Sequence, residues 1–212
     1  MTPESSLEFV HRFVASPSGK GPTLVLLHGT GGDENDLIPV GKSLLPEAAL
    51  LSPRGRVLEN GAPRFFRRFA EGVFDLDDLK LQTGALAGFV RAASVKYGLD
   101  AAQLIAVGYS NGANIAASVI LAEPDVFAGA ILFRAMPAFV PDAPPDLRNV
   151  PLLLTAGERD PIVKPEQTVA LAKIFENVGA RVSIHWHHGG HELGRDDLDA
   201  ATEWIRGWRK VK

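Results

Sequence analysis

Residues 104–122 place the tightest constraint on what this chain can fold into. An apolar run is followed by Gly108, Ser110 and Gly112 in the pattern G-x-S-x-G, and a helix-forming run begins at Ala113. A strand, a sharp turn and a helix in this order are typical of a nucleophile elbow, which exposes the serine hydroxyl above the carboxyl edge of a sheet. Glycine has no Cβ, so strand and helix can approach closely at both positions. The sequence therefore predicts Ser110 as a nucleophile, with a plain surface turn as the alternative.

Strands and helices alternate along the rest of the chain, which favours an α/β fold. Continuous or alternating apolar runs predict strands at residues 7–15, 23–27, 48–52, 104–107, 128–133, 152–156 and 181–186. Helical spacing of apolar residues and helix-stop glycines predict helices at residues 33–45, 77–97, 113–122, 165–178 and 198–208. Because crossovers between parallel strands are right-handed, this order gives a mostly parallel central sheet with helices on both faces.

A chain of 212 residues fits one α/β domain, and we expect residues 1–212 to form it. The proline-rich segment 137–151 leaves no room for the cap domain that many lipases carry at this point. The formal net charge of -3 is too small to indicate a nucleic-acid or an acidic membrane partner. The absence of cysteine excludes disulfides, thiolate metal sites and a cysteine nucleophile.

The start of the sequence gives no sign of export. The first six residues are polar and acidic, without the basic and apolar regions of a secretion signal. No apolar run approaches the roughly 20 residues that a membrane helix needs. We therefore expect a cytoplasmic protein that does not span a membrane.

A serine hydroxyl needs a base within hydrogen-bond reach, and the base needs a carboxylate that orients it. Asp160 follows the sixth predicted strand, at the sheet edge where open α/β sheets place their sites. Glu158 is a rival acid in the same loop, and a simple Asp-Pro turn is the structural alternative. His191 follows the seventh predicted strand in a glycine-containing loop. The sequence therefore predicts His191 as the general base for Ser110 and Asp160 as its partner.

An acyl-transfer site also needs two donors for the oxyanion. The backbone N–H of Asn111, directly after the predicted nucleophile, is one candidate. The second is expected from the loop after strand 23–27, at Thr30, where Gly31 and Gly32 allow close backbone approach to a substrate. A phosphate-binding loop is a weaker interpretation of this segment, because it lacks the P-loop lysine and the full dinucleotide-binding glycine pattern.

Four histidines close together in the sequence raise the alternative of a metal-dependent hydrolase. They are His185, His187, His188 and His191. Alternation along a strand puts His185 and His187 on one face, at a spacing that can ligate zinc. The same face carries Arg181 and Ser183, which is typical of a solvated side. Because no cysteine and no helical His-Glu-x-x-His motif supports a metal, we expect none.

Residues 53–75 are rich in Arg, Phe and Gly and lack a clear period, which predicts a long functional or mobile loop. Its Phe65 and Phe66, with Phe133 and Met136 after a later strand, can wall an apolar acyl pocket. The alternative is that the phenylalanines pack the loop onto the body of the protein and the arginines are solvated. The sequence does not decide between these two interpretations.

Four motifs together resemble the α/β-hydrolase superfamily. They are residues 27–32 (LHGTGG), 108–114 (GYSNGAN), 157–161 (GERDP) and 190–192 (GHE), and the likeness extends over nearly the whole chain. Within the superfamily the chain is most similar to the small phospholipase/carboxylesterase group, which includes bacterial carboxylesterases and acyl-protein thioesterases. Residues 63–68 (PRFFRR) resemble a bacterial branch of small serine hydrolases linked to quinone stress.

The resemblance implies hydrolysis of carboxylic esters or thioesters without a cofactor. By position it implies Ser110, Asp160 and His191 as the catalytic triad and Thr30 and Asn111 as the oxyanion donors. We therefore interpret the chain as a lidless serine carboxylesterase for small or short-chain esters. A thioesterase or lysophospholipase of the same fold, and a non-catalytic small-molecule binding protein, are the alternatives. The sequence leaves the oligomeric state open, a homodimer included.

Overall fold

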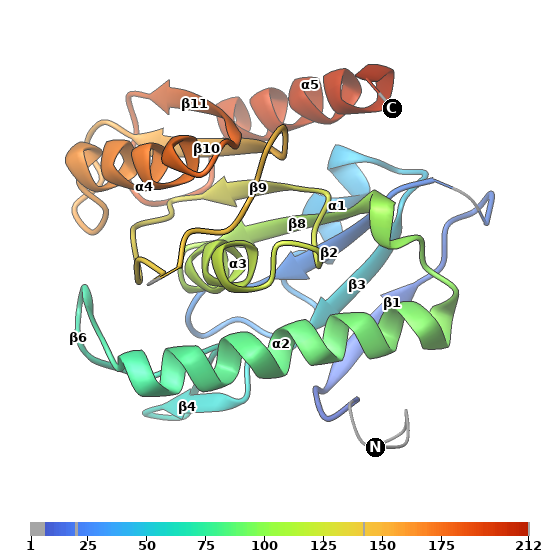
Figure 1. Ribbon diagram of the computed structural model, residues 1–212, viewed down its shortest axis with the longest axis horizontal. Helices are drawn as coiled ribbons and strands as arrows, with labels where there is room; N and C mark the ends of the chain where they lie inside the picture. Colours follow the sequence, from blue (N-terminus) through green and yellow to red (C-terminus); the bar gives the residue numbers. More distant parts are fainter. Residues whose placement is uncertain (1–6, 20, 142, 212) are drawn as a thin grey trace.

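In the computed structural model, which describes residues 7–19, 21–141 and 143–211, a seven-stranded sheet forms the centre of the molecule (Figure 1). In spatial order its strands are β1 (His11–Val14), β3 (Ala49–Pro53), β2 (Thr23–Leu27), β8 (Leu104–Tyr109), β9 (Gly129–Phe133), β10 (Pro151–Gly157) and β11 (Arg181–His187). The edge strand β1 runs antiparallel to β3, and the other neighbouring pairs are parallel. This confirms the mostly parallel sheet expected from the sequence.

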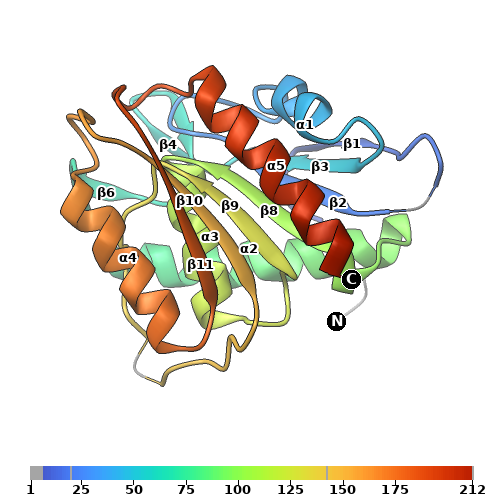
Figure 2. The same ribbon diagram turned by 90° about the horizontal axis from the view of Figure 1, so that it is seen from above.

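Helices cover both faces of the sheet. They are α1 (Ile38–Leu44), α2 (Leu76–Tyr97), α3 (Asn111–Ala122), α4 (Pro165–Asn177) and α5 (Arg195–Val211), with a short 3-10 helix, Ala101–Gln103, before β8. Figure 2 shows α2, α3 and α4 on one face and α1 and α5 on the other. The described ranges contain no inserted cap domain. The first six residues, where the sequence predicts no secretion signal, lie outside the described residues.

None of the described helices is both long enough and apolar enough to cross a lipid bilayer.

The central strands are buried on both faces because they carry apolar side chains in both directions. In β2, Val25 and Leu27 belong to the core under α2, α3 and α4, whereas Leu24 and Leu26 belong to the core under α1 and α5. All five residues of β2 are buried. At roughly 25 cal/mol per Å² of apolar surface removed from water, such double-sided burial stabilises the middle of the sheet most. The carboxyl edge of these strands is therefore a rigid base for loops.

The helix predicted at residues 33–45 is shorter in the structure and begins only at Ile38, so that Asp33, Glu34 and Asp36 precede it. The side chain of Asp33 accepts a hydrogen bond from the backbone N–H of Asn35 (2.7 Å). Local bonds of this kind compete with helix formation. Pro39 then suits the helix start, because its missing N–H would have no helical partner there.

Residues 53–75, expected to be a long loop, contain two short antiparallel hairpins. In the first, β4 (Val57–Glu59) pairs with β5 (Ala62–Arg64), and in the second, β6 (Arg68–Ala70) pairs with β7 (Val73–Phe74). The first turn is formed by Asn60 and Gly61, which both have positive φ (51° and 84°). Asn-Gly is the two-residue turn that best matches the twist of paired strands. It is the sequence signal that the loop prediction misses.

The turn between β8 and α3 depends on two close backbone approaches. A Cβ on Gly112 would overlap the carbonyl group of Leu27 at the end of β2, and a Cβ on Gly108 would lie 2.6 Å from Cα of Ala113. The obstacles are backbone atoms, which cannot rotate away as a side chain can, in an interior that is close-packed. The two glycines therefore let α3 start directly against the sheet, which places Ser110 at its carboxyl edge.

We expect Gly112→Ala to lower the free energy of unfolding by about 3 kcal/mol or more, because the backbone of two elements must move apart. Gly84→Ala is the matched control, since Gly84 lies within α2 and nothing lies within 4 Å of its would-be Cβ. That control should raise the free energy of unfolding by about 0.5–1 kcal/mol. Urea unfolding followed by circular dichroism measures both, and a Gly112→Ala variant as stable as the wild type would contradict the close packing.

Candidate active site

Ser110 forms the turn between β8 and α3 in a backbone conformation that side chains rarely adopt. Its φ and ψ are 51° and −114°, and values of this kind cost of the order of 1–3 kcal/mol. Hydrogen bonds on both sides hold this conformation. The N–H donates to the carbonyl of Phe133 (2.9 Å), and the carbonyl accepts from the N–H of Asn114 (2.9 Å). The partly exposed Ser110 is therefore anchored at a fixed place on the sheet edge.

Three side chains from distant parts of the chain form one line of hydrogen bonds. His191 Nε2 lies 3.0 Å from Ser110 Oγ, and His191 Nδ1 lies 2.8 Å from Asp160 Oδ2. An ionised carboxylate accepts and cannot donate, so Nδ1 carries its proton toward Asp160 and Nε2 is left to accept the serine proton. The structure thus brings together the three residues that the sequence singles out, in the order that an activated serine requires.

Asp160 is held as firmly as the serine. Its side chain is 1% exposed. Oδ1 accepts hydrogen bonds from the backbone N–H of Ile162 (2.8 Å) and of Val163 (2.9 Å), and Oδ2 faces His191. The loop after β10 therefore fixes the direction in which this carboxylate can orient the imidazole.

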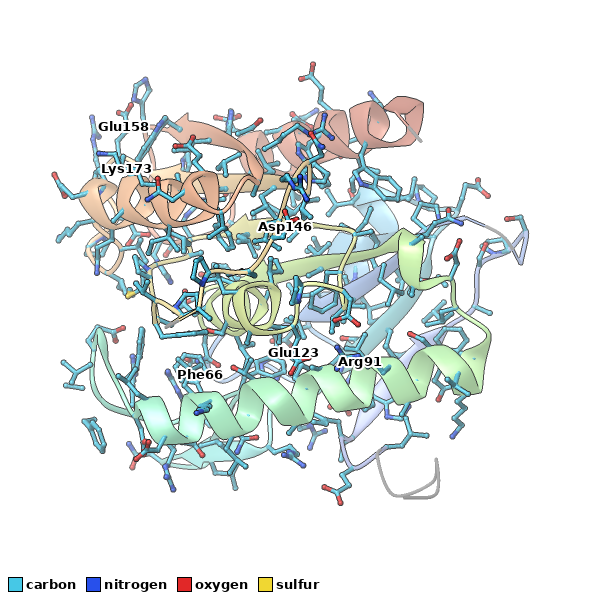
Figure 3. All side chains as sticks on the ribbon, in the orientation of Figure 1. Phe66, Arg91, Glu123, Asp146, Glu158 and Lys173 are labelled. Atoms are coloured by element: carbon cyan, nitrogen blue, oxygen red, sulfur yellow. The ribbon has the colours of Figure 1, made fainter. Side chains whose placement is uncertain are left out.

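The other candidate acid and the other histidines lie apart from this line. Glu158 lies at the outer edge of the molecule (Figure 3), where its carboxylate contacts Nδ1 of the exposed His188 (2.6 Å). His185 and His187 each have a buried Nε2 without a hydrogen-bond partner in the structure. Among the described residues, no three His, Cys, Asp or Glu side chains are grouped as a metal ion would require.

The loop that carries Thr30 is fixed by the hairpin of β4 and β5. The N–H of Gly31 donates to the carbonyl of Pro63 (2.9 Å), and Thr30 Oγ1 accepts from Arg64 Nη1 (2.6 Å). Arg64 is only 2% exposed, so this arginine is not solvated as the packing alternative assumes. Part of the segment 53–75 therefore braces the loop after β2.

The second predicted oxyanion residue is tied to the same hairpin. Asn111 is the first residue of α3, where a backbone N–H has no acceptor within the helix. Its buried side chain accepts a hydrogen bond through Oδ1 from the N–H of Phe65 (2.7 Å). The positive end of the helix dipole adds to the attraction for an anion at this N–H. Thr30 and Asn111 are thus held by two successive residues, Arg64 at the end of β5 and Phe65 directly after it.

The four side chains considered for an acyl pocket lie inside the core. Their exposed fractions are 1% for Phe65, 0% for Phe66, 0% for Phe133 and 4% for Met136. Phe66 meets the ring of Phe74 edge-on, with 5.2 Å between the ring centroids. The burial of Phe65 and Phe66 favours the alternative in which the phenylalanines pack their segment onto the body of the protein.

Comparison with known sequences identifies the family of this chain. The pattern of the phospholipase/carboxylesterase family matches residues 10–209. The chain belongs to the phospholipase/carboxylesterase family. The chain is 44% identical over 183 residues to the putative hydrolase MhqD of Bacillus subtilis (strain 168), with 86% of this chain and 92% of MhqD covered.

Solved structures of similar proteins have the same α/β-hydrolase fold. A carboxylesterase of Bacillus cereus superposes with a TM-score of 0.93 at 40% identity, with 96% of each chain covered. A carboxylesterase of Mesorhizobium loti superposes with a TM-score of 0.88 at 32% identity, with 95% of this chain and 96% of that chain covered. The chain is therefore a member of a hydrolase family with carboxylesterases among its similar structures.

Sequence reasoning misses two side chains that contact the loop of His191. Tyr109 Oη donates to the carbonyl of His191 (3.2 Å), and Arg134 donates to the carbonyls of Gly190 (3.1 Å) and Glu192 (2.8 Å). Burial raises the pKa of Tyr109, which keeps its hydroxyl protonated as a donor. A charged residue directly after the apolar strand β9 is the signal that could have found Arg134.

His28 holds the start of the Thr30 loop as a neutral imidazole. Its Nε2 accepts from the backbone N–H of Gly55 (2.9 Å), and its Nδ1 lies 2.7 Å from the carbonyl of Gly29. Burial lowers the pKa of His28. Below about pH 6.5, where an imidazole in the unfolded chain gains a proton, the folded protein therefore loses stability relative to the unfolded chain.

We expect this pH-dependent loss of stability to be smaller in His28→Gln. The glutamine amide oxygen can still accept a hydrogen bond from the N–H of Gly55, and it does not titrate. The free energy of unfolding in urea at pH 7.5 and at pH 5.5 measures the effect. The wild type should lose more stability between the two pH values than the variant does. Equal losses would show that His28 is not kept neutral by the fold.

Proposed function

We propose that this chain is a serine carboxylesterase in which Ser110 is the nucleophile, His191 the general base and Asp160 the residue that orients the base. The observation that carries the proposal is the unbroken line of hydrogen bonds from Ser110 Oγ through the imidazole to Asp160, with lengths of 3.0 and 2.8 Å. The membership of a family with carboxylesterases among its similar structures supports it.

The reaction follows from the positions of these groups. Ser110 Oγ attacks the ester carbonyl carbon while its proton passes to His191 Nε2, and Asp160 stabilises the imidazolium that forms. The tetrahedral intermediate collapses as its C–O bond to the alcohol breaks, and the alcohol leaves with the proton from Nε2. Water then attacks the acyl-enzyme, activated by the same nitrogen, and releases the acid.

The backbone N–H groups of Thr30 and Asn111 are the proposed donors to the oxyanion. The first follows β2 and the second begins α3, two elements that touch at Gly112 and Leu27. Removing one oxyanion donor in a serine hydrolase typically costs about 10²–10³ in kcat, so the fixed places of these loops matter for rate.

We further propose that the preferred substrates are small or short-chain esters. The described ranges carry no cap domain that would enclose a long acyl chain. The apolar side chains beside the site, Phe65, Phe66, Phe133 and Met136, are 0–4% exposed and so offer little surface to one. An ester with a short acyl group needs no such lining for attack on its carbonyl carbon.

Ser110→Ala should lower kcat for p-nitrophenyl acetate by about six orders of magnitude, because the nucleophile and base act as a unit. Ser118→Ala is the matched control: this buried serine lies on the same helix and donates only to the carbonyl of Asn114 (2.9 Å). The control should keep its activity and its labelling by a fluorophosphonate, and Ser110→Ala should lose both. A Ser110→Ala variant that hydrolyses the ester normally would overturn the mechanism. A wild type that resists labelling and turnover would indicate a binding protein.

A series of p-nitrophenyl esters tests the preferred chain length. The value of kcat/KM should be highest for the acetate and butyrate and should fall for the octanoate and palmitate. An acyl thioester and a lysophospholipid belong in the same series. If one of these two, or a long-chain ester, gives the highest kcat/KM, the short-chain proposal is wrong and thioesterase or lysophospholipase activity takes its place.

A further inference from the structure

Arg134 is a buried charge at the carboxyl edge of the sheet whose five N–H donors all have acceptors. It follows β9, has a φ of 58°, and its side chain is 0% exposed. Nη1 donates to Thr155 Oγ1 (2.8 Å) and Asp197 Oδ1 (2.8 Å), and Nη2 donates to Asp197 Oδ2 (2.7 Å). The remaining two donors reach the carbonyls of Gly190 and Glu192. A side chain that uses every donor is fixed in position.

The acidic partner of Arg134 also binds the end of the His191 loop. Asp197, in the first turn of α5, is also 0% exposed and neutralises the guanidinium. Burial alone would raise the pKa of Asp197, but hydrogen bonds from Arg134 and Gly194 lower it, so the carboxylate stays ionised. The N–H of Gly194 donates to Asp197 Oδ2 (2.8 Å), which ties the far end of the loop to the same pair.

Three successive carbonyls of this loop therefore accept hydrogen bonds from side chains. Arg134 holds those of Gly190 and Glu192, and Tyr109 holds that of His191 itself. These carbonyls lie outside any strand or helix. Two glycines precede His191 and would otherwise leave the loop many conformations. Side-chain donors thus bind the backbone carbonyls of this loop, as the N–H groups of a neighbouring strand would in a sheet.

We propose that Arg134, with Tyr109, is a positioning residue for the general base: it fixes the backbone on either side of His191 so that the imidazole stays within reach of Ser110 and Asp160. The proposal rests on the esterase function proposed above. Arg134 touches no reacting atom, and its positive charge is balanced by Asp197. Its contribution is therefore geometric, and it should affect kcat far more than KM.

Arg134→Lys tests this, because lysine keeps the charge beside Asp197 but cannot supply the planar set of five donors. A displacement of a catalytic group by about 1 Å can cost roughly 10²-fold in rate, so we expect a fall in kcat of that size for p-nitrophenyl acetate. The KM should change less than twofold. Tyr109→Phe removes one hydrogen bond and should lower kcat by roughly 2- to 10-fold.

Two further measurements separate positioning from a general loss of stability. Phe175→Leu, a core substitution near the end of α4, lies beside the start of β11 and so at the sheet edge opposite the loop. It is the control for lowered stability, and it should keep its kcat. Hydrogen–deuterium exchange of residues 188–194 should become several-fold faster in Arg134→Lys and Tyr109→Phe, and should be unchanged in Phe175→Leu. If Arg134→Lys does not fold, Tyr109→Phe still decides between these outcomes.

Normal kcat and normal exchange in the folded variants would overturn the positioning role. The exchange measurement does not depend on the reaction, so the two proposals fail separately. Activity retained by Ser110→Ala overturns the esterase mechanism. The exchange measurement then still tests whether Arg134 and Tyr109 fix the loop. Loss of activity in Ser110→Ala together with an unaffected Arg134→Lys overturns only the positioning role.

Discussion

The contact between the start of α3 and the end of β2 is the constraint on which the rest of the site depends. Gly112 meets the carbonyl group of Leu27 so closely that no side chain fits between them. This approach forces Ser110 into its positive φ, because the chain must reverse within one residue to enter the helix. It also brings the end of β2 and the start of the loop that carries Thr30 against the first turn of α3. One backbone contact therefore fixes Ser110, the proposed nucleophile, and joins the two elements that lead to the proposed oxyanion donors.

The places of Asp160 and His191, the proposed acid and base, depend on a second close approach, between the end of β10 and the loop after β11. A Cβ on Gly157 would overlap the carbonyl of Gly190. The two loops are joined further on, because the N–H of Glu158 donates to the carbonyl of His187 (2.9 Å) and that of Arg159 to the carbonyl of Gly189 (3.1 Å). Parallel neighbours end at the same edge of a sheet, so residues 31 positions apart in the chain can bond at 2.8 Å.

The sequence predicts those parts of the site that follow from strand ends and misses those that depend on distant partners. Ser110, Asp160 and His191 each lie just after a strand that is legible from its apolar run, and the topology of a parallel sheet then places them together. The Asn60-Gly61 turn is a local signal, and it is missed because the surrounding segment has no strong period. The place of Arg134 directly after an apolar strand is a signal for the residue itself, but its pairing with Asp197 is not predictable, because the two lie 63 residues apart.

The positions of the strands in the sheet explain why Ser110 and His191 are held by different kinds of contact. β8, which leads to the proposed nucleophile, lies in the middle of the sheet and is buried along nearly its whole length. β11, which leads to the proposed base, is an edge strand with no fully buried residue. Apolar packing can therefore hold Ser110, whereas His191 follows an edge strand that has a neighbouring strand on one side only. Polar contacts must supply the missing restraint, and a buried arginine with an ionised partner can hold several carbonyls at once. In this fold the burial of a charge, which costs free energy, occurs where the hydrophobic core no longer reaches the loop of the proposed general base.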